Sequence, residues 1–220
     1  MFMTAWNIIK GFARIMIRIV VETIHRLVIN LFDSFFGFLN WPEKKLRIKI
    51  LILADSQNNP IVSPADLVSA IDYARKVFKR NFNVRLLAQH GSFAEVLQKS
   101  APSEALHTKG STGALGEEFK IAGSFFSINL SGLFYPVTAF VVMDIKGASG
   151  CSLGPISDYV TLDSLGAKND SILAHEIAHA CGLWHLNETP NLMWRTRQRG
   201  DEVKWWQKNI FRSSRHTTYW

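Results

Sequence analysis

The sequence contains no run of 18 uninterrupted apolar residues, so we expect no conventional membrane-spanning helix. Cysteine is also scarce. The chain has 220 residues and two cysteines, which excludes a small disulfide scaffold and allows at most one disulfide. No internal repeat is visible, and the composition is neither that of a disordered chain nor that of a collagen. With 47% hydrophobic residues, the chain can form one ordinary domain with a real core, plus an appendage.

Positive charge is concentrated at the two ends of the sequence. Residues 1–45 hold six Lys or Arg against three acidic residues, and residues 195–220 hold seven against two. Residues 46–194 hold twelve against thirteen, so the net charge of +7 comes from the ends. A nucleic-acid-binding domain gathers its charge on one face and interleaves it with aromatic residues, so we expect no nucleic-acid partner. The basic ends are either contacts to an anionic surface or solvated tails.

Residues 6–39 have the pattern of an amphipathic helix. Charged residues recur at every fourth position and leave a broad apolar face opposite; they are Lys10, Arg14, Arg18, Glu22 and Arg26. They interrupt the apolar region that a standard secretory signal peptide needs. Three roles are open for residues 1–41: a helix in a membrane interface, a helix that packs on the core or on a partner chain, or a pro-segment. We favour an anionic membrane surface or a partner chain, and with it a membrane-associated or secreted protein.

The globular domain is expected to start after Trp41-Pro42 and to span residues 42–220. Residues 46–54 alternate and then run apolar, as does a strand that enters a sheet covered on both faces. Residues 63–66 (Ser-Pro-Ala-Asp) predict a helix start, with the helix continuing to about Phe82. Residues 83–89 predict a second strand, which completes a βαβ unit.

The second half of the chain is predicted to hold one loop, several strands and two helices. Residues 99–124 are rich in Gly, Ser and Thr and indicate a long loop or insertion. The remaining predictions are a buried strand over Pro136–Ile145, extended pieces at Cys151–Pro155 and Asp158–Leu162, and helices over Asp170–Gly182 and Asp201–Phe211.

One group of residues has the spacing of a metal site. On a helix, His175 and His179 lie at i and i+4, so both imidazoles project from one face and can bind a single ion. Gly182 permits a backbone turn that ends the helix, after which His185 can return as a third ligand. Three neutral nitrogens leave the fourth zinc position for water, which is typical of a catalytic site. Glu176 is close enough to act on that water without being a ligand.

Residues 175–185 resemble the extended zinc motif of the metzincin clan of metalloproteases. Asn191-Leu192-Met193-Trp194 is similar to the turn that places a methionine beneath the metal in that clan, with Met193 as the methionine. The resemblance implies an α/β (α+β) fold: a twisted, mostly parallel sheet with an antiparallel edge strand and an active-site helix. It also implies that the edge strand pairs with extended substrate, and Cys151–Pro155 is the segment best placed for this. Arg195 stands where some families carry a metal-binding tyrosine, so no fifth protein ligand is expected.

These observations predict a zinc-dependent endopeptidase that acts on peptides or proteins. One catalytic zinc would be held by His175, His179 and His185, and Glu176 would act as general base toward a zinc-activated water. The alternative is a zinc-containing protein on the same scaffold that binds a membrane or partner and hydrolyses nothing. The sequence leaves open whether Cys151 and Cys181 form a disulfide.

Overall fold

The protein is described here by a computed structural model that covers most of the chain. The described residues are 24, 27–89, 91–109, 137–156, 158–196 and 198–219. The whole first half of the helix predicted over residues 6–39, and most of the loop predicted over residues 99–124, lie outside these residues.

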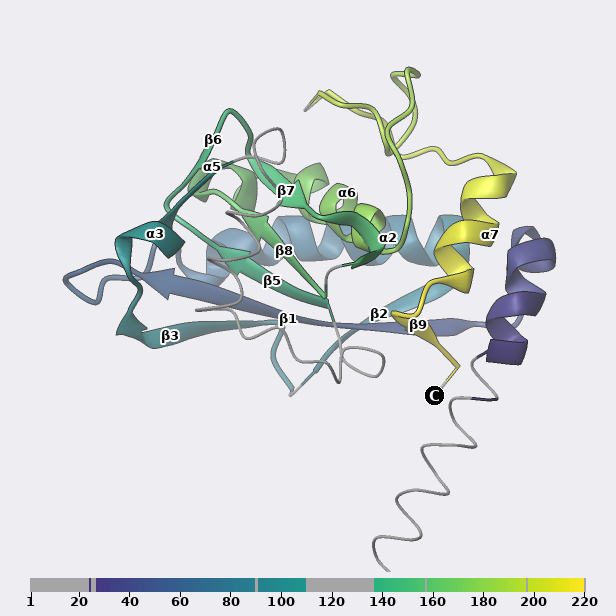
Figure 1. Ribbon diagram of the computed structural model, residues 1–220, viewed down its shortest axis with the longest axis horizontal. Helices are drawn as coiled ribbons and strands as arrows, with labels where there is room; N and C mark the ends of the chain where they lie inside the picture. The colour runs from purple at the N-terminus through teal and green to yellow at the C-terminus, as the bar shows by residue number, and fades with distance from the viewer. Residues whose placement is uncertain are drawn as a thin grey trace, which may run out of the picture.

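A mixed, mostly parallel sheet forms the centre of the molecule (Figure 1). Its strand order is β2-β1-β5-β8-β7, with β3 and β9 paired to β1 beside this path. The strands are β1 (Lys44–Ala54), β2 (Val84–Ala88), β3 (Ala94–Ser100), β5 (Val137–Val141), β7 (Gly150–Ser152), β8 (Tyr159–Leu162) and β9 (Thr217–Thr218). Strands β2, β1, β5 and β8 are parallel, whereas β7 is antiparallel to β8 and ends the order. The predicted fold class, with its antiparallel edge strand, is confirmed.

Strand β1 pairs with β2, β3, β5 and β9, and its side chains lie in two different environments. Burial alternates from Lys44 to Ile50, and every residue from Ile52 to Ala54 is buried. An alternating strand has one face against the core, whereas a continuously buried strand is covered on both faces. The change from alternating to continuous apolar residues, predicted from the sequence, is therefore confirmed.

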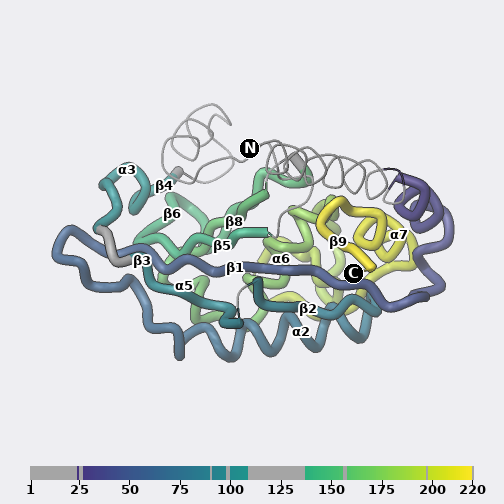
Figure 2. The backbone as a smooth tube through the Cα atoms, turned by 90° about the horizontal axis from the view of Figure 1, so that it is seen from below, coloured from purple at the N-terminus to yellow at the C-terminus, as the bar shows by residue number. Residues whose placement is uncertain are grey.

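Two helices cover one face of the sheet and pack against each other: α2 (Val68–Phe82) and α6 (Asp170–Ala180) (Figures 1 and 2). The short helix η2 (Pro64–Leu67) leads into α2 and starts with the predicted cap. The Asp66 amide donates to the Ser63 hydroxyl, and the Ser63 amide donates to the Asp66 carboxylate at 2.9 Å. This capping box satisfies amides that have no partner within the helix. The predicted unit of strand, helix and parallel strand is present as β1, α2 and β2.

Three predictions about local structure are wrong. The described part of residues 99–124 is not a loop, because it contains α3 (Ser103–Leu106) and β4 (His107–Lys109). The predicted strand over residues 136–145 is two strands, β5 and β6 (Asp144–Lys146), and β6 pairs with β4 in a second, two-stranded sheet. The short strand β4 exists through this distant partner, and neither its length nor its composition indicates a strand.

The third correction concerns Cys151–Pro155. Only its beginning is extended, since β7 ends at Ser152 and Gly154–Ile156 forms the helical turn η4. Gly154 has a φ of 69°, a left-handed conformation that glycine adopts without strain and that ends the strand. A short helix, α5 (Ser164–Ala167), follows β8.

The described end of the N-terminal segment packs against the C-terminal helix α7 (Trp205–Ser213). Residues 27–36 are helical and continue into η1 (Gly37–Leu39), and both lie beside α7 (Figure 1). A Cβ atom at Gly37 would lie 2.8 Å from the Cα atom of Asn209, so glycine permits this close approach. The Asn209 amide donates to two carbonyls of the segment at 3.1 Å and accepts from the Phe38 amide at 2.6 Å. Within the described residues, no helix is both long and apolar enough to cross a membrane.

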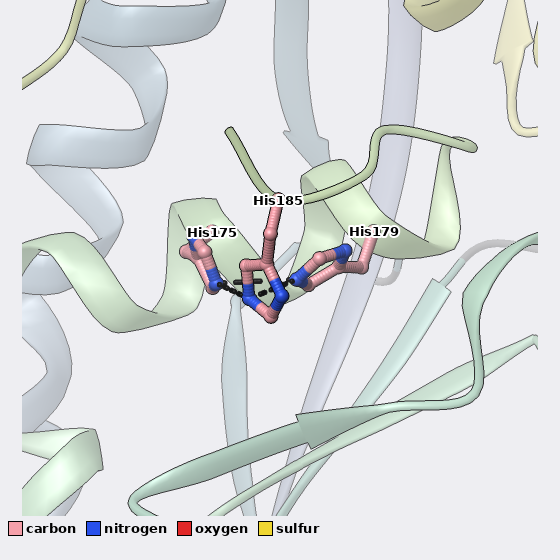
Figure 3. A group of neighbouring side chains, drawn as sticks. All are labelled: His175, His179 and His185. Carbon is pink, nitrogen blue, oxygen red and sulfur yellow. Dashed lines mark hydrogen bonds between the residues drawn. The ribbon is translucent and has the colours of Figure 1, made fainter. Parts of the chain in front are cut away.

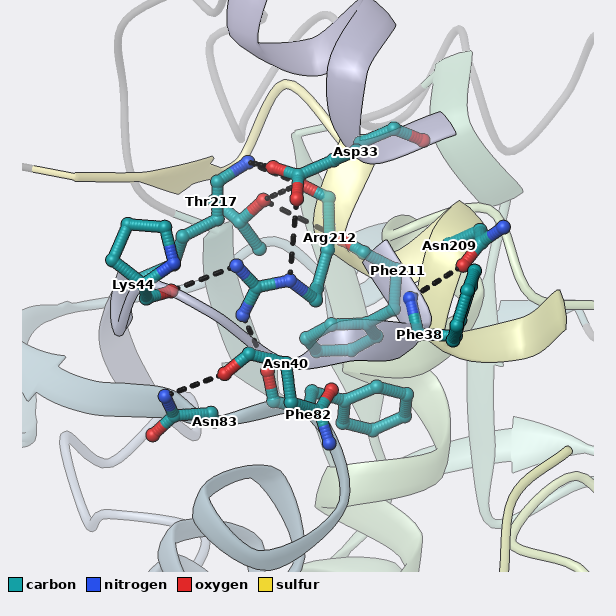
Figure 4. A network of polar contacts seen from close by, with 12 residues as sticks. Asp33, Phe38, Asn40, Lys44, Phe82, Asn83, Asn209, Phe211, Arg212 and Thr217 are labelled. Atoms are coloured by element: carbon teal, nitrogen blue, oxygen red, sulfur yellow. Dashed lines mark hydrogen bonds and ion pairs between the residues drawn. The ribbon is translucent and has the colours of Figure 1, made fainter. Parts of the chain in front are cut away.

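A buried ionic network joins this segment to β1 and α7 (Figure 4). The Asp33 carboxylate contacts Lys44 Nζ at 2.5 Å and Arg212 Nε at 3.3 Å, and all three residues are fully buried. It also accepts from the hydroxyl of Tyr219 at 3.0 Å. Arg212 donates in addition to the carbonyls of Phe82 and Pro42, both at 2.7 Å. The domain boundary after Trp41 stays a prediction, and these contacts cross it.

Candidate metal centre and active site

Helix α6 presents two histidines at one face. The Asn169 side chain accepts the Ser171 amide at 3.1 Å and caps the helix start. His175 and His179 follow one turn apart. Gly182, with a φ of 94°, ends the helix, as predicted.

The three predicted histidines meet at a single point (Figure 3). The Nε2 atoms of His175 and His179 are 3.1 Å apart. His185, which follows the turn after α6, places its Nε2 atom 3.3 Å from that of His175 and 3.2 Å from that of His179. The three histidines therefore form a group that could hold one metal ion.

Backbone carbonyls determine which nitrogen of two of these imidazoles carries the proton. His175 Nδ1 lies 2.9 Å from the carbonyl oxygen of Leu192, and His179 Nδ1 lies 2.7 Å from that of Leu183. A carbonyl can only accept, so Nδ1–H donates in both cases and the Nε2 lone pair is left at the centre. Unprotonated nitrogens this close repel one another unless a cation lies between them. Zn–N bonds of about 2.0–2.1 Å in a tetrahedron separate ligand nitrogens by about 3.3 Å, which fits the observed spacing.

The environment keeps the imidazoles neutral, as metal binding requires. Burial lowers the pKa of His175 well below its usual range and lowers that of His179 to about 4. Burial also lowers the pKa of the more exposed His185, with a further contribution from the positive charge of Arg195. At neutral pH the three side chains therefore need not lose a proton before they could hold a cation.

Glu176 is held between α6 and the edge strand β7. Its side chain is buried, and burial raises the pKa of the carboxyl group to about 8, against a lowering by the Arg199 guanidinium. A Cβ atom at Gly150 would lie 2.6 Å from Oε1 of Glu176, so only glycine lets β7 pass this closely. Sequence reasoning missed Gly150, because a close approach between distant segments leaves no local pattern.

Met193 is fully buried and lies in a tight turn beside the histidines. Asn191 holds this turn: its Oδ1 accepts the Met193 amide at 2.9 Å, and its amide group pairs reciprocally with that of the buried Gln207 at 2.9 and 3.2 Å. The Leu192 carbonyl between them accepts from His175. Gln207 thus connects the start of α7 to the turn, a contact that the sequence analysis did not find.

The histidines and Glu176 line a cavity of about 930 Å³. Its lining also includes the stretch from Gly147 to Pro155, which contains β7, and the residues Arg195, Thr196 and Arg199. The two cysteines are buried and are not bonded to each other, so the disulfide left open by the sequence is absent. Burial raises the pKa of Cys181 to about 12, which keeps its thiol protonated.

The predicted resemblance to the metzincin clan therefore holds at this site: the three histidines converge, and the turn with Met193 lies beside them. No family model matches the sequence, and no curated protein matches it either. Among solved structures, the chain is similar to metalloproteinase-II from Bacteroides fragilis, with 14% identity and a TM-score of 0.48. The match covers 73% of this chain and 49% of that one, so it spans about half of that protein's length.

Proposed function

We propose that the protein is a zinc-dependent endopeptidase. The observation that carries this proposal is the convergence of three Nε2 atoms within 3.1–3.3 Å. Two of the three are fixed as lone-pair donors by backbone carbonyls. An all-nitrogen set of three protein ligands suits zinc and leaves one position open, as in catalytic zinc sites.

The chain's own residues supply the rest of the chemistry. His175, His179 and His185 hold the metal, and Gly182 and Met193 shape the site around them. When bound, zinc supplies a Lewis acid that lowers the pKa of water and polarises the substrate carbonyl. The charge of a divalent cation held by the histidines would favour the ionised form of Glu176 over the protonated form that burial favours. Glu176 then accepts the proton of the attacking water on its carboxylate and passes it to the leaving amine.

The edge strand β7 is the element we propose for substrate binding. It ends the sheet order and lines the cavity beside Glu176. An extended peptide added to such an edge is held by main-chain hydrogen bonds, which gives affinity with little sequence selection. The alternative function, a zinc-containing binding protein without catalysis, leaves the buried Glu176 without a role at the metal.

Metal content and peptide cleavage, measured on the same preparation, test this function. Elemental analysis of the full chain purified without chelator should show about one zinc per chain. The loaded protein should cleave members of a broad peptide library, and a chelator should abolish cleavage. A second tightly bound zinc, or none after supplementation, would contradict the ligand set. Full zinc loading with no cleavage of any peptide would favour the non-catalytic alternative.

We also propose that the N-terminal segment attaches the protein to an anionic lipid surface. Exposed apolar side chains cluster on the helix that precedes η1 and on the residues after it. We call this set the apolar surface: Ile24, Leu27, Val28, Leu31, Phe32, Phe35, Phe36, Phe38, Leu39, Trp41 and Trp205. Trp205 belongs to it because its ring lies edge-on to Phe38 at 6.2 Å between ring centroids. Exposed apolar side chains that gather on one segment mark an interaction site more often than exposed apolar residues scattered singly.

Charge favours lipid over a protein partner for this surface. In the sequence, residues 1–45 and residues 195–220 each carry an excess of Lys and Arg, and η1 in the first range packs on α7 in the second. A sequence that combines apolar and aromatic residues with an excess of Lys and Arg is typical of segments that lie in the interface of an anionic membrane.

Vesicle co-sedimentation tests the attachment. The full chain should sediment with vesicles that contain anionic phospholipid and much less with purely zwitterionic ones. The double substitution Leu31→Glu and Phe35→Glu should lower the bound fraction about tenfold or more, since each apolar side chain contributes about 1.5–3 kcal/mol. Leu165→Glu, an equally exposed leucine on α5, is the matched control and should bind like the parent. Concentration-dependent self-association without vesicle binding would instead assign the surface to a second copy of the chain.

A further inference from the structure

Arg199 presents an unpaired cation to the proposed active site. It lines the cavity with the histidines, and its Nη1 atom is buried without a hydrogen-bond partner. Its Nε–H donates to the Thr196 carbonyl at 2.9 Å, which fixes one side of the guanidinium. Among the described residues, no carboxylate lies within ion-pair distance of it. Burying a guanidinium nitrogen without a hydrogen-bond partner costs free energy. A ligand that accepts a hydrogen bond from Nη1 would remove this cost.

The backbone beside Arg199 is held against the segment that carries Met193. The Gly200 amide donates to the Thr189 carbonyl at 2.8 Å, and the Glu202 amide donates to the Pro190 carbonyl at 2.9 Å. A Cβ atom at Gly200 would lie 2.2 Å from the Pro190 oxygen, so the two stretches pass as closely as a glycine permits. Arg199 is therefore positioned before any substrate arrives.

The carboxylates that line the cavity make no ion pair or hydrogen bond with Arg199. Glu176 interacts with Arg199 through its charge, but its side chain is buried against Gly150 on β7. Asp163 accepts the Gly166 amide as the cap of α5. A second arginine, the exposed Arg195, also lines the cavity. Two guanidinium groups in the lining of one cavity create a positive potential that attracts an anion.

We propose that Arg199, assisted by Arg195, binds a carboxylate of the peptide substrate next to the scissile bond. The inference rests on the proposed function and names a substrate class for it. A guanidinium binds carboxylate with two parallel N–H bonds, which makes this pairing stronger and more directional than a neutral hydrogen bond. The carboxylate belongs either to an Asp or Glu side chain or to the C-terminus of the substrate.

Matched peptides separate the two sources. One pair differs only by Glu against Gln within three residues of the cleaved bond, with a blocked C-terminus; the other differs only by a free against an amidated C-terminus. In at least one pair, the parent should cleave the peptide that has the carboxylate with a higher kcat/KM than the peptide that lacks it. Arg199→Gln should reduce that preference about tenfold to a hundredfold, because charge-assisted hydrogen bonds are the strong ones. Arg199→Lys should restore part of it, and Arg75→Gln, an exposed arginine on α2, should leave it unchanged.

A binding measurement without catalysis tests the role of Arg199 independently of whether the protein cleaves peptides. Zinc-loaded protein with Glu176→Gln is titrated with fluorescently labelled members of both pairs, and anisotropy gives the affinities, with and without Arg199→Gln. A carboxylate preference that depends on Arg199 supports the inference even where the parent cleaves nothing. Equal affinities within each pair, or no binding at all, would overturn it. A uniform loss of kcat/KM for all peptides in Arg199→Gln would also overturn it, since Arg199 would then act only on Glu176.

Discussion

Replacing Glu176 by Gln is expected to slow peptide hydrolysis by about 10²–10⁴-fold and to leave about one zinc per chain. The amide has nearly the same shape as the carboxylate, so it fits the space beside Gly150. All three histidines stay in place. The substitution removes only the group that accepts the proton of the attacking water. The measurement is kcat/KM on a cleaved peptide, together with elemental analysis of the same sample.

Two further variants serve as controls for Glu176→Gln. His179→Ala leaves two imidazoles, so both metal and activity should be lost. Glu95→Gln removes an exposed carboxylate on β3 that pairs with Lys49, and both quantities should stay as in the parent. Should Glu176→Gln cleave as fast as the parent with zinc bound, the proposed role of Glu176 is wrong.

The second large effect is expected on stability. Asp33→Asn should lower the free energy of unfolding by about 3–5 kcal/mol, because Lys44 and Arg212 would keep two buried positive charges without a carboxylate. Desolvation already disfavours the charged form of Lys44 and lowers its pKa to about 8. Urea unfolding of the full chain, followed by circular dichroism, gives the difference.

An exposed ion pair provides the comparison for Asp33. Asp72 and Arg75 lie one turn apart on α2 and are about half exposed, so Asp72→Asn should change the free energy of unfolding by less than about 1 kcal/mol. Equal, small effects of the two substitutions would show that residues 33–41 contribute little to the folded body. A large effect of Asp33→Asn alone would show that the body extends back across the predicted boundary after Trp41.

The parts of the fold predicted from the sequence are those governed by neighbouring residues. The change from alternating to continuous apolar residues in β1, the Ser63–Asp66 cap, and the i and i+4 spacing of His175 and His179 all depend on local geometry. Once a segment is known to be a strand or a helix, each of these patterns determines which side chains lie on the same face. The turn at Gly182 is of the same kind.

The parts that sequence reasoning missed depend on residues far apart in the chain. Strand β3 is largely polar and pairs with β1. The close approach of Gly150 to Glu176 joins residues 26 positions apart, and the Asp33–Arg212 contact joins residues 179 apart. In the sequence, nothing distinguishes Arg199 from the other basic residues of the C-terminal stretch. Arg199 lines the cavity because the neighbouring Gly200 packs against Pro190, and no local pattern predicts this contact.

The contact between Gly150 and Glu176 also affects the entropy of catalysis. A free glutamate side chain samples many rotamers, and restricting it to one is unfavourable by up to about 2 kcal/mol. In this protein β7 leaves the carboxylate so little room that the restriction is imposed when the chain folds. Substrate then meets a base that already has its orientation, and none of the binding energy is used to order it. A larger residue at position 150 would displace the carboxylate of Glu176. We expect this substitution to lower kcat more than it raises KM.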